Sequence, residues 1–230
     1  MNESLQTVYT AGSGVALQQR NRVLRNTYWL LALSLLPTVL GAWVGVGTGV
    51  MARMGVGMSA IIFLAGAFGF IFAIEKTKDS AAGVGVLLAF TFFMGVMLSR
   101  LLGAVLGFRN GSTLIMTAFG GTAGVFFAMA MLATVIKRDL SNMGKFLFVG
   151  AVMLLAAGII NIFVQSSAMM LTLSVIAIGL FSAFLLYDIK RIVDGGETNY
   201  VSATLAIYLD LYNIFQSLLV LLGFAGGERE

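Results

Sequence analysis

The sequence predicts an all-α membrane protein, a bundle whose helices cross the bilayer about seven times. Of its 230 residues, 59% are apolar and only 10% are charged, and the mean hydropathy is +0.98. Soluble domains carry about 25% charged residues, so this chain cannot build a fully solvated surface. The apolar residues also fall into separate long runs joined by short polar stretches. The bilayer is therefore the expected surroundings of nearly the whole chain.

Seven apolar runs are candidate spans, because each is close to or above the roughly 20 residues that a transmembrane helix needs. They cover residues 27–51, 55–74, 80–107, 112–136, 146–165, 168–188 and 200–222. The third run contains Arg100, so its last turns are expected in the membrane interface. Together the runs form one domain, 27–222. Residues 1–26 are polar and lack the apolar stretch of a signal peptide, so they are interpreted as a disordered cytosolic tail, and 223–230 as a short C-terminal tail.

The distribution of lysine and arginine predicts which side each end of the chain occupies. Cytoplasmic loops carry the excess of positive charge. With the N-terminus in the cytoplasm, ten basic residues lie inside: Arg20, Arg22, Arg25, Lys76, Lys78, Lys137, Arg138, Lys145, Lys190 and Arg191. Only four then lie outside: Arg53, Arg100, Arg109 and Arg229. We expect a cytoplasmic N-terminus and an external C-terminus, and we interpret Lys190 and Arg191 as determinants of this topology.

Composition excludes several classes of chemistry. The chain has no cysteine and no histidine, which removes thiol catalysis, disulfides, iron–sulfur clusters and imidazole-bound metals. Its net charge of +4 is spread between apolar runs rather than gathered in a patch, so a nucleic-acid partner is not expected. No resident cofactor is expected either.

Small residues recur at four-residue spacing in three of the spans. These ridges are Gly41, Gly45 and Gly49; Gly95, Ser99, Gly103 and Gly107; and Gly120 with Gly124. Small-xxx-small patterns allow helix backbones to approach closely in lipid. We interpret all three ridges as helix contacts, and the glycines at 45–49 are not a phosphate loop because no strand precedes them.

Asp188 and Asp210 lie inside the last two apolar runs and are the principal candidates for a functional site. A carboxylate at membrane depth costs roughly 2.5–3.5 kcal/mol on insertion scales, and such residues usually face a cavity, bind an ion or move a proton. Two carboxyl groups close together in a medium of low polarity cannot both ionise cheaply, so the pair would share one proton. A structural hydrogen-bond network is the alternative interpretation.

The last span has one small and polar face, which should turn away from lipid. At about 100° per residue this face carries Ala203, Ala206, Asp210, Asn213 and Ser217, with Tyr208, Tyr212 and Gln216 roughly opposite. Gly195 and Gly196 should end the preceding helix, and Thr198 or Asn199 can cap the last one. Asp188 then lies about 9 Å from the turn and Asp210 about 16 Å, so a tilt is needed to bring them together.

Five segments carry a family resemblance. They are VLRNTYWLL at 23–31, KRDLSNMG at 137–144, LLYDIKRI at 185–192, GGETNYVSAT at 195–204 and YLDLYNIFQSLL at 208–219. With these, residues 20–225 resemble the Bax inhibitor-1 family of membrane proteins, most closely its bacterial YccA-like branch. The resemblance implies seven helices with the last one surrounded by the other six, in a bacterial inner membrane.

The resemblance also implies two different functions. Some relatives are pH-sensitive calcium leaks, in which two aspartates matching Asp188 and Asp210 form the proton sensor. In this chain Asp188 and Asp210, supported by Asn213 and Ser217, supply too few oxygen ligands for a tight calcium site, so a weak, transient one is expected. Those relatives use a basic latch where this chain has Glu75 and Lys76, which puts the latch in doubt, although Glu75 could attract cations. The YccA-like branch instead resembles substrates and modulators of the membrane-anchored AAA protease, engaged through residues 1–26.

Two further functions are only partly compatible with the sequence. Intramembrane aspartyl proteases also use two aspartates on adjacent helices, and Tyr187–Asp188 fits their first motif. Asp210 stands in IYLD rather than GxGD, and Pro37 is the sole proline, so an enzyme is not expected. A proton-coupled transporter is compatible with buried carboxylates, but no inverted repeat with interrupted helices is visible.

Overall fold

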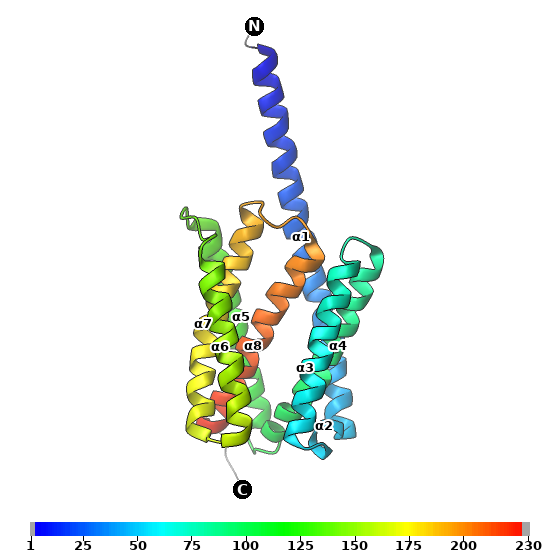
Figure 1. Cartoon of the computed structure of the whole chain (residues 1–230), viewed down its shortest axis with the longest axis vertical. Coiled ribbons are helices and arrows are strands. Elements are labelled where there is room, and N and C mark those ends of the chain that lie inside the picture. Colours follow the sequence, from blue (N-terminus) through cyan, green and yellow to red (C-terminus); the bar gives the residue numbers. More distant parts are fainter. Residues whose placement is uncertain (1–2, 227–230) are drawn as a thin grey trace.

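The computed structural model is all-helical over the residues it describes, 3–226, with side chains from residue 18 onward. Its helices are α1 (Glu3–Thr48), α2 (Val50–Arg53), α3 (Val56–Thr77), α4 (Ala81–Leu106), α5 (Gly111–Val135), α6 (Met143–Val164), α7 (Ser167–Val193) and α8 (Tyr200–Gly226). Apart from α2, each is long and apolar enough to cross a membrane, with the α1 span starting at Gln18. The prediction of seven spans is confirmed (Figure 1).

The start of α1 differs from the expected disordered tail. The helix runs without a break from Glu3 to Thr48, and its first turns project beyond the other helices (Figure 1). No proline interrupts residues 3–26, and adding residues to an existing helix costs far less than nucleating a new one. The polar segment therefore extends the first span as a helix.

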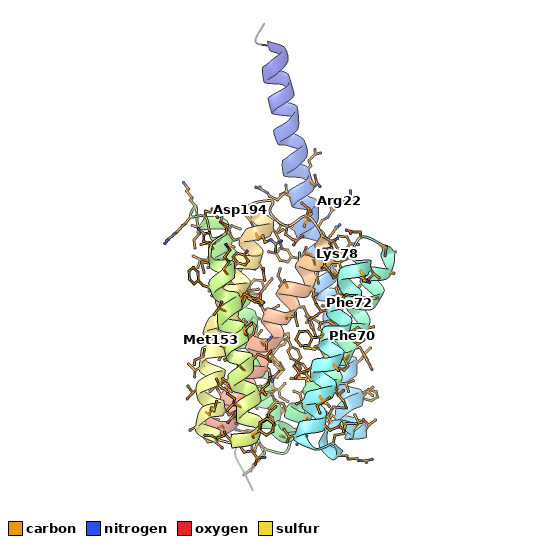
Figure 2. All side chains as sticks on the ribbon, in the orientation of Figure 1. Arg22, Phe70, Phe72, Lys78, Met153 and Asp194 are labelled. Carbon is orange, nitrogen blue, oxygen red and sulfur yellow. The ribbon has the colours of Figure 1, made fainter. Side chains whose placement is uncertain are left out.

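The turns of the bundle lie at two opposite ends, and each end carries charged residues. The end from which α1 projects also holds the α3–α4, α5–α6 and α7–α8 turns, and Arg22, Lys78 and Asp194 lie there (Figure 2). We call this the N-terminal end. At the opposite end, the guanidinium of Arg100 donates to the carbonyl oxygens of Met51 and Met54, at 3.2 and 2.8 Å. Arg100 thus satisfies the backbone of the α2–α3 turn, and an interfacial position for the end of α4 fits this contact.

Helix α8 is the central element of the bundle. It packs against α7, α5, α1, α4 and α3, whereas α6 packs mainly on α7. In an apolar stretch of 18 residues in α8, 44% of the residues are buried, whereas the corresponding stretches of α3 and α6 have 6% buried. Large side chains on the outer helices, such as Trp29, Trp43 and Phe163, are more than 70% exposed and suit contact with lipid.

Helices α1 and α4 approach so closely that two positions exclude any side chain. A Cβ at Gly41 would collide with the backbone carbonyl of Phe92, and a Cβ at Gly95 would collide with that of Thr38. Because both obstacles are backbone, neither collision can be relieved by a rotamer change. The predicted glycine ridges of the two helices therefore meet face to face.

Only part of each ridge is used in this way. Gly45 faces the side chain of Ser99, which extends the close α1–α4 contact by one turn. In contrast, a Cβ at Gly103, Gly120 or Gly124 would have no neighbour within 4 Å. The prediction of close packing is thus confirmed for the α1–α4 contact, and wrong within this chain for the Gly120 and Gly124 pair.

Candidate functional site

Asp188 and Asp210 meet between α7 and α8. Asp210 is 4% exposed and Asp188 is partly buried, and their carboxyl groups lie close enough to act on each other electrostatically. α8 is inclined to α7 (Figure 1), which removes the difference in depth expected from counting residues to the turn. The predicted pairing of the two carboxyl groups is therefore present in the fold.

The proximity of two buried carboxyl groups favours a proton shared between them. Two ionised carboxylates have no donor between them, so a hydrogen bond needs one protonated carboxyl group. The Oδ2 atom of Asp210 is buried and has no hydrogen-bond partner among the described residues. An unpaired buried charge would be costly, and a shared proton would both neutralise Asp210 and supply a donor.

Two tyrosines on the opposite face of α8 form hydrogen bonds to α1 and α4. The hydroxyl of Tyr208 is hydrogen-bonded to that of Thr38 at 2.9 Å, and the hydroxyl of Tyr212 donates to the carbonyl of Met94 at 3.3 Å. Tyr208 and Tyr212 are 2% and 7% exposed. Both faces of α8 are therefore buried, and the hydrogen bonds of the two tyrosines to α1 and α4 help to fix the position of Asp210 on the other face.

The two residues predicted to support the pair lie further along α8. The side-chain amide of Asn213 donates to the carbonyl of Leu209 in its own helix, at 2.8 Å. Ser217 is 8% exposed. The inward direction of the polar face is confirmed by the burial of Asp210 and Ser217, while the described contact of Asn213 is local to α8.

A pocket of about 370 Å³ opens at the N-terminal end of the bundle and leads to Asp188. Its polar lining consists of Glu75, Lys78, Asp188, Arg191, Glu197 and Ser202, and its apolar lining comes mainly from the first turns of α8. Asp210 is not part of the lining. Asp188 therefore stands between the pocket and the buried carboxyl group of Asp210.

The charged groups around the pocket are mostly paired. Lys78 forms an ion pair with Glu75, and this hydrogen bond raises the pKa of Lys78 above its usual value. Arg191 pairs with Glu197, with Nη2 and Oε2 3.2 Å apart. Lys76 instead lies over the ring of Phe72, 4.6 Å from its centroid, and does not line the pocket. The basic side chains that line the pocket together with Asp188 are Lys78 and Arg191.

Sequence reasoning assigned no site role to Arg191 or Glu197. Arg191 follows Asp188 by three residues, a spacing that places both on one helix face, and this signal was available in the sequence. Glu197 lies in the α7–α8 loop, and its position depends on how that loop folds back.

The site is too poor in ligands for a tightly held metal ion. Calcium takes about six to eight oxygen ligands. Among the described residues no three histidine, cysteine, aspartate or glutamate side chains cluster closely enough to hold a metal. Two aspartates could therefore contact a passing cation only if water and backbone carbonyls completed its shell.

Asn199 connects this region to the rest of the bundle. Its Oδ1 accepts hydrogen bonds from the backbone N–H groups of Val201 and Ser202, at 2.9 and 3.1 Å, which caps α8. Its Nδ2 donates to the carbonyl of Lys78 and to Oδ1 of Asp79, at 3.1 and 2.8 Å. One side chain thus fixes the start of α8 against the α3–α4 turn.

Replacing Asn199 with alanine is expected to destabilise the bundle by about 1–2 kcal/mol, because the cap and the link to α3–α4 are lost together. For a chain of this size this corresponds to a fall of about 2–8 °C in the melting temperature, measured in detergent. Asn142→Ala is the matched control, since Asn142 precedes α6 without a side-chain cap. Equal melting temperatures for the two variants would contradict the role of Asn199.

Comparison with known proteins places the chain in a family. The family model described as "Inhibitor of apoptosis-promoting Bax1" matches residues 20–227. The chain is 38% identical over 213 residues to the Escherichia coli K12 protein named "Modulator of FtsH protease YccA", covering 93% of this chain and 94% of the relative.

Two further relatives have names without a function. A Vibrio cholerae "Uncharacterized membrane protein" is 38% identical over 209 residues, covering 89% of this chain and 90% of the relative. A Pseudomonas aeruginosa protein, "Uncharacterized protein PA2604", is 37% identical over 222 residues, covering 96% and 97%. None of the three names describes an enzymatic activity.

Proposed function

The chain belongs to the Bax inhibitor-1 family, and on that premise we propose that it modulates a membrane-anchored AAA protease of the FtsH type. Support comes from its similarity, along almost the whole chain, to an E. coli inner-membrane protein named for this role. The similarity to this relative covers 93% of the chain, and the family model matches residues 20–227, so the bundle is shared and a common mode of action requires no additional domain.

The first turns of α1 are the proposed contact with the protease. They continue the first span as a helix and project past the turns at the N-terminal end (Figure 1). If this end faces the cytoplasm, as the ten basic residues predict, the segment is presented to a cytosolic protease domain. The bundle would then hold the segment at the membrane surface.

Deleting residues 1–17 is expected to abolish modulation while leaving the spans intact, because the α1 span begins at Gln18. The measurement is the degradation rate of a membrane substrate by the protease in vesicles with wild-type chain, with the deletion variant or with neither. The deletion variant should match vesicles that lack the chain. Asp210→Asn is the control and should still modulate; a deletion variant that does so too would refute the contact.

A second function is favoured by the carboxyl pair. Asp210 is buried with an unpartnered oxygen beside Asp188, and Asp188 lines a pocket that opens at the N-terminal end. This arrangement suits a pH-dependent cation leak: a shared proton joins α7 and α8, and its loss places two negative charges side by side that repel and attract water and a cation. Calcium influx into liposomes that contain the protein, compared with empty liposomes, tests this function independently of any protease.

A further inference from the structure

Arg191 lies between two carboxylates on the wall of the pocket. It is three residues after Asp188 on α7, and its guanidinium pairs with Glu197 at 3.2 Å. Asp188 is acted on electrostatically by both Arg191 and Glu197. All three side chains line the pocket. Asp188 and Glu197 therefore compete for the guanidinium of Arg191, which is paired with Glu197 in this structure.

Glu197 is the fixed member of this group. Its Oε1 accepts the backbone N–H of Asn199 at 2.9 Å, and only 16% of its side chain is exposed. The loop that carries it is anchored where the N–H groups of Gly196 and Glu197 donate to the carbonyl of Arg191, at 2.8 and 3.2 Å. The Arg191 side chain is 47% exposed, so it is the member with room to move.

We propose that Arg191 is a movable counter-ion and that its choice between Glu197 and Asp188 controls whether a cation in the pocket reaches Asp188. On Glu197, Arg191 leaves Asp188 open to the pocket. On Asp188, the guanidinium neutralises that carboxylate and excludes another cation from it. This inference rests on the proposed cation leak and assigns Arg191 as the positioning residue that limits access to it.

The neighbouring charges are compatible with both positions of Arg191. Lys78 lines the same pocket and is acted on electrostatically by Glu197 as well as by its partner Glu75. Glu197 would therefore retain a cationic neighbour after Arg191 moved to Asp188. Helix α5, which packs against both α7 and α8, carries no ionisable side chain, so no other charge competes from that side.

Substitution of the two partners of this ion pair is expected to have opposite effects. Glu197→Gln releases Arg191 to Asp188 and should slow calcium influx into liposomes, whereas Arg191→Gln leaves Asp188 open and should speed it. Each change should be about two- to fivefold, the range for a partly exposed ion pair. A purely structural ion pair would instead give the same direction for both variants. The double variant should behave like Arg191→Gln, because Glu197 acts only through Arg191.

A second measurement does not depend on ion flux. The chain has no cysteine, so Ala206→Cys places one thiol in the pocket, one helical turn before Asp210. A neutral thiol reagent should modify it more slowly in the Glu197→Gln background and faster in the Arg191→Gln background. An uncharged reagent is neither attracted nor repelled by the charges around the pocket, and rates measured over a range of pH separate access from changes in the ionisation of the thiol.

The adjacent ion pair provides matched controls. Lys190 and Asp194 pair at 2.6 Å at the same end of α7 but do not line the pocket, so Lys190→Gln and Asp194→Asn should change neither rate. Shifts in the same direction for Arg191→Gln and Glu197→Gln, or shifts no larger than those of the controls, would overturn the inference. A wild type as tight as empty liposomes would refute the cation leak, and the thiol rates would still decide the role of Arg191.

Discussion

Replacing Gly95 with leucine is expected to be among the most damaging single substitutions in this chain. A Cβ at this position collides with the carbonyl of Thr38 and the backbone nitrogen of Ala42 on α1. Overpacking a core usually costs about 1–3 kcal/mol when side chains can adjust, and here the obstacle is backbone, so the cost should reach or exceed the upper value. α1 would have to move away from α4 along its most extensive contact.

The test is the melting temperature of the purified protein in detergent, together with the fraction that elutes as a single species. Gly103→Leu is the matched control, because it lies on the same helix and a Cβ there has no neighbour within 4 Å. Leucine favours a helix over glycine by up to about 1 kcal/mol, so the control should be neutral or slightly stabilising. Similar losses for both variants would show that the α1–α4 backbone contact is not what Gly95 provides.

Replacing Asp210 with asparagine is expected to remove the pH dependence of calcium influx. In the wild type, influx should be slow at mildly acidic pH, where a shared proton joins α7 and α8, and faster at mildly alkaline pH, where the two carboxylates repel. The amide of asparagine donates a hydrogen bond to Asp188 at every pH, so α7 and α8 should stay joined. The other charges that face the pair, Arg191, Glu197 and the Glu75–Lys78 pair, are unchanged by the substitution.

Calcium influx is followed with a dye inside liposomes at both pH values. Asp194→Asn is the control: it makes the same chemical change at the same end of the bundle, but Asp194 pairs with Lys190 and does not line the pocket. This control should keep the wild-type pH dependence. An Asp210→Asn protein whose influx still rises with pH would exclude the carboxyl pair as the sensor.

Helix positions were accessible from the sequence because, in a membrane, hydropathy alone nearly determines where a span lies. The seven predicted runs match seven long helices, and the pairing of Asp188 with Asp210 follows from their places on consecutive spans. Pairing also required a tilt of α8, which depends on packing against α1 and α4. The ridge pattern similarly showed which helices carry glycine but not that Gly95 would meet backbone while Gly103 would meet nothing.

Two features depend on long-range geometry and could not be predicted from local pattern. The polarity of residues 1–26 led to the prediction of a disordered tail, whereas the structure continues α1 through this segment from Glu3. Polarity argues against a membrane span, but it does not argue against a helix. The partner of Arg191 depends on the loop at 194–199 folding back over the end of α7. A residue interpreted as a topology determinant thereby becomes part of the pocket wall.

The unbroken α1 helix also has a mechanical consequence. A force applied near Glu3 would meet no break in the helix before Thr48, so it would be transmitted to the glycine-lined contact with α4. That contact runs parallel to the pull and would be loaded in shear, with many backbone neighbours resisting at once rather than one after another. Such a chain should yield late and abruptly, and the α1–α4 contact should add to the work needed to withdraw α1 from the bilayer.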